Sequence, residues 1–175
     1  MIRNFRLAAG LAGIVVTAAA LAPTAVLART TDEGLAAQAR HNKAVVSAAF
    51  ERWAAGGSDF FTEILAPNVI WIIEGSGPSA GRFEGRDAFM ERAVAPFAGR
   101  LSTPVRPVET EVWADGDHVI IRWDGEGVAR DGQPYENSYV WIFRLVGDQA
   151  MEVTAFLDLA PYDDVLRRIP APGGE

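Results

Sequence analysis

The spacing of hydrophobic residues changes along this chain, from a helical period in the first half to a strand period in the second. Over residues 31–55, Val46, Ala49, Phe50 and Trp53 recur at helical spacing and would share one face of a helix. Later in the chain, apolar and polar residues alternate over long runs, which is typical of strands that bury one face. The pattern predicts helices first and a sheet afterwards.

The remaining elements follow from the same spacing and from the Gly and Pro residues that interrupt it. Ahead of the sheet, we expect a short helix, a strand, a loop and a third helix over residues 60–65, 69–74, 75–85 and 87–97. Four long strands and a last short helix are predicted over residues 105–114, 118–129, 135–146, 150–158 and 162–169.

Three short turns separate the four long strands. They contain Asp115-Gly116, Asp131-Gly132 and Gly147-Asp148, the residue types of tight hairpins. Four strands joined by three hairpins form an antiparallel meander, with helices packed on one of its faces. The fold class that follows is α+β, in one domain over residues 31–170, because no linker is long enough to separate two domains.

The first 28 residues have the pattern of a cleavable leader. Arg3 and Arg6 give a positive start, an uncharged apolar run of 15 residues follows over 7–21, and Pro23 breaks it. Small side chains then stand at 26–28, where a signal peptidase cuts. The alternative, a retained membrane anchor, would need about 20 apolar residues. We expect a signal peptide over residues 1–28, a periplasmic or secreted mature protein, and no membrane partner after cleavage.

The amino-acid composition argues against several kinds of partner and cofactor. The chain has 23 Asp and Glu against 16 Lys and Arg, a net charge of −7, which disfavours nucleic acid as a partner. It has no Cys, which excludes disulfides, thiolate catalysis, lipidation on cysteine and cysteine-based metal sites. His41 and His118 are the only histidines, and neither has a second ligand at metal spacing, so no metal is expected.

Residues 75–81 match parts of two known motifs, a nucleophile elbow and a dinucleotide-binding loop, but the secondary structure that each motif needs is not expected around them. Residues 77–81 read G-x-S-x-G, but a nucleophile elbow needs a strand that runs straight into a helix, and no helix is expected before Asp87. Gly75 and Gly77 suggest a dinucleotide loop, but Pro78 and the missing parallel strand argue against it. We therefore expect no cofactor.

Several stretches resemble one family. The runs 71–88, 131–143 and 156–158 are similar to the strand–loop–helix, the central hairpin and the last strand of SnoaL-like, ketosteroid isomerase-related proteins of the nuclear transport factor 2-like superfamily. The resemblance covers nearly all of the chain after the leader. It implies a curled antiparallel sheet closed by N-terminal helices into a cone, with a ligand at its centre. Such a scaffold carries many functions, so the resemblance leaves the reaction open.

Ketosteroid isomerase is one member with which the chain can be compared. The resemblance places its base at Ile72 or Ile73 and its oxyanion-hole residues at Phe50 and Trp141. None of these side chains can move a proton, so isomerisation by that route is not expected.

Comparison with limonene epoxide hydrolase and the SnoaL-type polyketide cyclases suggests a different pair of catalytic residues. The Arg-x-Asp of the hydrolase aligns with Arg122 and Asp124, while its remaining catalytic positions hold Ala155, Trp71 and Ile73. A cyclase-like pocket acid would be Asp124 or Glu126. Arg122 and Asp124 are thus the catalytic candidates.

Alternation along the strands decides which residues share a face, but not which face is inside. If the resemblance sets the inside, the cone is lined by a set of substrate-binding candidates around the pair, namely Trp71, Ile73, Glu126, Asn137, Tyr139, Trp141 and Ala155. The opposite stripe of Val119, Ile121 and Trp123 would then cover a homodimer interface. In the alternative, that stripe is core and the charged residues face solvent. Asn137 should have a specific partner, since Asn is disfavoured inside strands.

Two classes of function remain open for a pocket that takes a small apolar molecule. The first is an enzyme, an isomerase, cyclase or epoxide-hydrolase-like protein that uses Asp124 with Arg122. The second is a non-catalytic ligand-binding protein, or a module that assembles through its sheet. The charged residues favour the first class, and the missing base favours the second.

Overall fold

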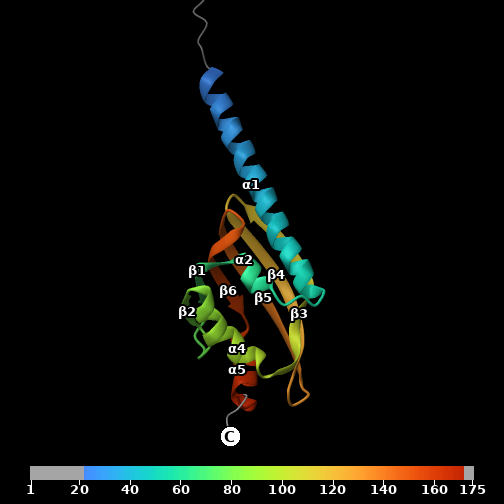
Figure 1. Ribbon diagram of the computed structural model, residues 1–175. Coiled ribbons are helices and arrows are strands. Elements are labelled where there is room, and N and C mark those ends of the chain that lie inside the picture. The colour runs from blue at the N-terminus through green and yellow to red at the C-terminus, as the bar shows by residue number, and fades with distance from the viewer. Residues whose placement is uncertain (1–21, 172–175) are drawn as a thin grey trace, which may run out of the picture.

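A computed structural model describes residues 22–171, with side chains from residue 32. Its elements are α1 (Ala22–Ala54), α2 (Phe60–Ile64), β1 (Leu65–Ile73), β2 (Gly81–Glu84), α3 (Arg86–Phe89), the π-helical turn η1 (Met90–Val94), α4 (Ala95–Ala98), β3 (Leu101–Asp115), β4 (His118–Ala129), β5 (Pro134–Val146), β6 (Gln149–Leu157) and α5 (Leu159–Arg168). The strands form one curled, unclosed six-stranded sheet in the order β2-β1-β6-β5-β4-β3, with the helices on its concave side (Figure 1). The α+β fold class is confirmed.

The predicted meander is confirmed. Strands β3, β4, β5 and β6 pair antiparallel in sequence order. Each connecting turn has its glycine at positive φ, 55° at Gly116, 84° at Gly132 and 61° at Gly147. These angles are open to glycine at little steric cost, so the turn residues set the three hairpins as the sequence indicated.

The edge beside β6 differs from expectation. Residues 81–84 form β2, although the sequence predicted a loop there, because a strand of four residues is too short to show a period. Strand β1 pairs with β2 on one side and runs parallel to β6 on the other. The third predicted helix is interrupted by η1, just before Pro96, which has no N–H to continue the helical hydrogen bonding.

The core fills the space between the concave face and the helices. Val46 and Phe50 of α1 are at most 2% exposed, as are Trp71, Trp123 and Phe143 on the sheet. Aromatic rings meet edge-to-face across this space, with centroids 5.9 Å apart for Phe50 and Trp123. Burial of side chains of this size stabilises a fold by about 1.5–3 kcal/mol each, so this aromatic layer supplies much of the stability.

Strand β4 curls tightly against β3. A Cβ on Gly125 would lie 2.6 Å from Cζ3 of Trp123 and 2.8 Å from Cγ1 of Val105, closer than real side chains approach. The β3–β4 register also shifts between Leu101 and Glu109. Such irregularities bend a strand, and here they accompany the curl of the sheet.

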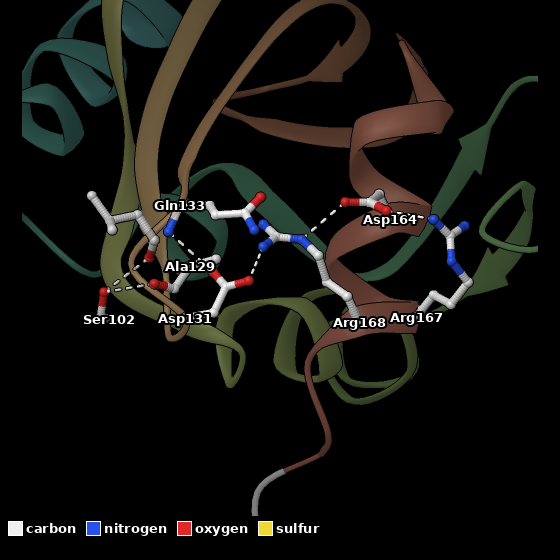
Figure 2. Close-up of polar contacts among 8 residues, drawn as sticks. Ser102, Ala129, Asp131, Gln133, Asp164, Arg167 and Arg168 are labelled. Atoms are coloured by element: carbon white, nitrogen blue, oxygen red, sulfur yellow. Dashed lines mark hydrogen bonds and ion pairs between the residues drawn. The ribbon is translucent and has the colours of Figure 1, made fainter.

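Helix α5 closes the far end of the sheet and is tied to the β4–β5 turn (Figure 2). Arg168 pairs with Asp131 of that turn, and its Nε lies 2.9 Å from Oδ2 of Asp164. Although burial acts in the opposite direction, the Gln133 N–H and the Arg168 guanidinium together hold the pKa of Asp131 below its ordinary value. These contacts tie the end of α5 to the turn, and the same helix carries Tyr162, which lines the cavity described below.

Residues 1–21, which include the charged start and the apolar run of the predicted leader, lie outside the described residues. Helix α1 starts at Ala22, and its first turns project beyond the sheet (Figure 1). Within residues 22–171, no helix is both long enough and apolar enough to cross a membrane.

Candidate functional site

A cavity of about 200 Å³ lies between the concave face of the sheet and the helices that cover it. It has 18 lining residues, and nine of these are aromatic. They come from every layer of the fold, including α1, α2, β1, β4, β5 and α5. A preformed apolar cavity of this kind is the usual form of a small-molecule site.

Five of the predicted site residues line this cavity. They are Trp71, Ile73, Tyr139, Trp141 and Ala155. The register brings them together: Ala155 of β6 stands opposite Trp141 on one side and beside Ile73 on the other. Residues paired across strands point to the same face, which is why the three strands present one continuous wall.

The expected orientation of Arg122, Asp124 and Glu126 is wrong. They lie on the convex, outer face, away from the cavity. Arg122 is opposite Val140, and Asp124 is opposite Ser138, both on the outer face of β5. The physical reason is register: Trp123, not its neighbours, stands opposite the cavity residue Tyr139. The structure therefore has the alternative orientation, in which the stripe is core and the charged residues face outward.

The stripe of Val119, Ile121 and Trp123 is therefore core and not an outer surface. These residues are 0%, 0% and 1% exposed. The homodimer interface expected on this stripe is wrong, because the stripe is covered by the chain's own helices. Trp123 is also a wall of the cavity, where it stacks on Tyr139 with ring centroids 3.9 Å apart.

Arg122 and Asp124 do form the expected pair, on the outer face. Arg122 Nη1 lies 2.7 Å from Oδ2 of Asp124, with side chains 35% and 27% exposed. Ser138 Oγ donates to Asp124 Oδ1 at 2.6 Å. A catalytic role for this pair would have to be exercised on the convex side of the sheet, across β4 from the cavity.

Asn137 has the specific partner that its place in a strand predicted. Its Oδ1 accepts from the Asp158 N–H at 3.2 Å, and its Nδ2 donates to the Asp158 carbonyl at 2.8 Å. Nδ2 also donates to the hydroxyl of Tyr135 at 2.9 Å. Asn137 is 8% exposed and does not line the cavity itself. It lies on the same face of β5 as Tyr139, and it holds the hydroxyl of Tyr135.

The titratable groups of the wall are two tyrosines. Tyr139 and Tyr162 line the cavity, and burial raises the pKa of each well above its ordinary value. Burial also raises the pKa of Tyr135, whose hydroxyl lies 2.8 Å from that of Tyr139. All three therefore remain neutral hydroxyls at physiological pH. They can donate or accept a hydrogen bond, but they cannot act as phenolate bases.

Apart from Arg122 and Asp124, the positions aligned with known catalytic residues hold apolar side chains in or against this wall. Ile73, Trp71 and Ala155 line the cavity, and Phe50 packs edge-to-face on Trp141 at 5.7 Å. Among the described residues that line the cavity, none is Asp, Glu, His, Lys or Arg. Across residues 22–171, no group of three or more His, Asp or Glu is placed to hold a metal ion.

Two indole donors in the wall have no hydrogen-bond partner. The Nε1 atoms of Trp71 and Trp123 are both completely buried. Each ring meets Trp141 edge-to-face, with centroids 5.1 and 4.8 Å apart. Since both nitrogens are completely buried, neither is exposed to the cavity.

Sequence reasoning missed the part of the wall that the helices provide. Trp53, Phe61, Phe89, Phe97 and Tyr162 all line the cavity. Trp53 falls on the apolar helical face recognised in the sequence, so its spacing could have identified it. Phe97 and Tyr162 stack at 4.1 Å across α4 and α5, a contact between helices that no sequence period encodes.

Comparison with known proteins places this arrangement in a family. The sequence model of the SnoaL-like domain matches residues 46–153. A search of curated proteins found no match in sequence.

Solved structures share the fold at low identity. A nuclear transport factor 2-like protein from Burkholderia xenovorans is 18% identical, with a TM-score of 0.56 over 73% of this chain and 97% of that one. A protein from Jannaschia sp. named as a SnoaL-like polyketide cyclase is 23% identical, with a TM-score of 0.58 over 76% and 96% of the two chains. TerC, crystallised with polyporic acid, is 16% identical, with a TM-score of 0.59 over 72% and 98%.

At these identities the solved structures establish the fold, and the sequence match establishes the family, because it spans more than half of the chain. The protein belongs to the SnoaL-like domain family, within the nuclear transport factor 2-like fold.

Proposed function

We propose that this member of the SnoaL-like domain family binds a small, uncharged, largely apolar molecule in the aromatic cavity, without acid–base catalysis. The wall of the cavity carries the proposal, because no charged side chain lines it among the described residues. A charged ligand would lose its hydration on entering this cavity and would find no oppositely charged side chain there. This desolvation costs several kcal/mol. An apolar ligand gains about 25 cal/mol for each Å² that it buries.

The neighbours support a small organic ligand. A relative named as a polyketide cyclase and a relative crystallised with polyporic acid share this scaffold. Catalysis of isomerisation or cyclisation would require a group that takes a proton near neutral pH. The tyrosines of this wall hold their protons there, which favours binding over proton transfer.

Binding of a neutral aromatic molecule tests the proposal. Four of the five tryptophans line the cavity, namely Trp53, Trp71, Trp123 and Trp141. Toluene should therefore change the tryptophan emission in a saturable way, and benzoate, which is charged, should not. Absence of saturable binding by toluene, or equal binding of benzoate, would contradict the proposal.

A cavity-filling variant locates the bound molecule. Ala155→Leu adds three carbons to the wall and should weaken toluene binding by about tenfold or more, since it takes up part of a small cavity. Thr154→Leu is the matched control, because Thr154 is the adjacent residue, opposite outward-facing Ile142. Circular dichroism checks that both variants fold. Equal toluene affinity in the two variants would place the ligand elsewhere.

We further propose that the chain is exported after removal of residues 1–28. Support comes from the charged start, the apolar run and the small residues before the cut. Mass spectrometry of the protein recovered from the periplasm or medium of a bacterial host should show a chain that begins at Arg29. A soluble, exported product that keeps Met1 to Ala28 would contradict it.

We also propose that the chain forms a homodimer through the outer face of the sheet. Trp113, Ile120 and Phe156 lie on that face and are 50%, 37% and 45% exposed, which leaves apolar area for a second copy to cover. Light scattering should give the mass of a dimer, and Phe156→Lys should shift it to a monomer. A wild-type monomer at tens of micromolar, on the order expected for a modest interface, would contradict this.

A further inference from the structure

The hydroxyl groups of the cavity gather at one point. Tyr139 and Tyr135 stand on the same face of β5, with their hydroxyl oxygens 2.8 Å apart. Tyr139 lines the cavity, whereas Tyr135 is 2% exposed and is not among the lining residues. Either oxygen could donate to the other, so the direction of this bond has to come from the remaining partners.

Asn137 fixes that direction. Its amide makes two bonds to the Asp158 backbone, one accepted by Oδ1 at 3.2 Å and one donated by Nδ2 at 2.8 Å. This two-point contact leaves a single orientation of the amide, since the reverse would set donor against donor. The group that faces the Tyr135 oxygen is therefore Nδ2, a donor, at 2.9 Å. Tyr135 accepts from Asn137.

The hydrogen of Tyr135 then needs an acceptor. Among the described residues, its polar partners are Asn137 and Tyr139, and Asn137 is a donor. If Tyr139 donated to Tyr135, the Tyr135 hydrogen would be left unpaired in a buried place, which costs about 1–3 kcal/mol. Tyr135 consequently donates to Tyr139. The two hydrogen bonds thus have one direction, from Asn137 to Tyr135 and from Tyr135 to Tyr139.

This order leaves the hydroxyl hydrogen of Tyr139, a residue that lines the cavity, without an acceptor among the described residues. The ring of Tyr139 is held by its stack on Trp123, with centroids 3.9 Å and planes 7° apart. A hydroxyl that accepts one hydrogen bond also becomes a better donor of the next. The wall thus presents a positioned donor with no acceptor among the described residues.

Other polar atoms of the wall do not duplicate it. The hydroxyl of Tyr162 donates to the Ala93 carbonyl at 3.1 Å, so its hydrogen is used. The indole nitrogens of Trp71 and Trp123 are completely buried and are not exposed to the cavity. Hydrogen-bond donation to a ligand therefore falls to Tyr139.

We propose that the cavity selects a neutral molecule of single-ring size that carries a carbonyl oxygen, and that Tyr139 donates its hydroxyl hydrogen to that oxygen. The size follows from the volume, about 200 Å³, compared with an engineered cavity of about 150 Å³ that holds benzene. The aromatic lining favours a flat ring. The proposal rests on the proposed function and adds the ligand's one polar group.

Two probes of nearly the same shape test the assignment. Acetophenone has the carbonyl, and in α-methylstyrene a CH₂ group replaces its oxygen. Calorimetric titration should give acetophenone the higher affinity by roughly threefold to tenfold, the effect of one hydrogen bond. Tyr139→Phe should abolish this preference while it retains α-methylstyrene binding. Tyr162→Phe, which removes a cavity hydroxyl already in use, should keep the preference.

An infrared readout separates hydrogen bonding from packing. The carbonyl stretch of bound acetophenone should lie at lower frequency than in hexane, and Tyr139→Phe should return it to the hexane value. Tyr135→Phe should weaken acetophenone binding or leave it unchanged, because Tyr139 already donates to the ligand. A clear gain in affinity would mean that Tyr139 normally donates to Tyr135, and it would overturn the proposal.

The outcomes distinguish this proposal from the one on which it rests. If neither probe binds, the proposed function itself fails. If both bind equally to the wild type, or if the preference survives in Tyr139→Phe, the cavity is a binding site but Tyr139 does not select a carbonyl.

Discussion

On β4, Val119, Ile121 and Trp123 are at most 1% exposed, whereas Arg122 and Asp124, on the alternate positions, have side chains 35% and 27% exposed. The inner face of this strand forms the wall of a cavity and the core beneath it, and the outer face carries an ion pair in contact with water. Neighbours in sequence thus belong to different environments with different energetics. Where chemistry is sought on a curled sheet, cross-strand register matters more than the residue types of the strand itself.

The largest effect that would test this difference is expected on the inner face. Trp123→Ala removes a stacked, buried ring and should lower the free energy of unfolding by about 3–5 kcal/mol, measured by urea denaturation. Trp113→Ala, at a position 50% exposed, should lower it by less than about 1 kcal/mol. Similar losses at the two positions would mean that the faces are not as different as the burial indicates.

A smaller effect is expected from the ion pair on the outer face. Arg122→Ala and Asp124→Ala should each lower the free energy of unfolding by under about 1 kcal/mol, because water screens the pair. The double variant should show little coupling, measured as the departure from additivity in a four-protein cycle. Losses of about 3–5 kcal/mol with strong coupling would instead indicate that the pair is buried.

The smallest effect is expected at the tether of α5, and it depends on pH. The pKa of Asp131 is lowered in the folded chain, so its charged form stabilises the fold above the ordinary Asp pKa of about 3.9. This contribution is lost as the pH falls through the folded pKa. Asp131→Asn should therefore lower Tm slightly at pH 7, and its difference from the wild type should shrink below about pH 4.

Calorimetry at several pH values measures this difference. Asp87→Asn is the control, since the Asp87 side chain is 98% exposed and lies 3.8 Å from Arg86, its one ion-pair partner among the described residues. It should show no such change with pH. A constant difference between Asp131→Asn and the wild type from pH 3 to pH 7, or none at either end, would count against an ionic tether.

The sequence was informative wherever a short local signal decides the structure. The glycine-containing turns predicted the hairpins, and the helical spacing around Phe50 predicted the buried face of α1. Asn137 was correctly expected to need a partner, because a polar amide in a strand is otherwise left unpaired. These signals lie within a few residues of one another in the chain.

Features set by distant contacts could not be predicted in the same way. Alternation on β4 has two solutions, and only the pairing of Trp123 with Tyr139 selects one of them. The cavity is also completed by a stack of Phe97 on Tyr162, which joins two short helices far apart in the chain. Aromatic residues in short helices have the pattern of ordinary core residues, so no signal in the sequence indicates that they enclose an open space.

The glycine at position 125 has a consequence for how such a cavity can diversify. A methyl group there would press on the rings of Trp123 and Tyr139, whose nearest atoms are 2.6 and 3.1 Å from its place. The room available to a ligand thus depends on a position that does not itself line the cavity but lies against residues that do. Substitution at this position during evolution would change the size of ligand that the cavity accepts, with every lining residue unchanged. A comparison of lining residues alone would therefore miss the change in selectivity.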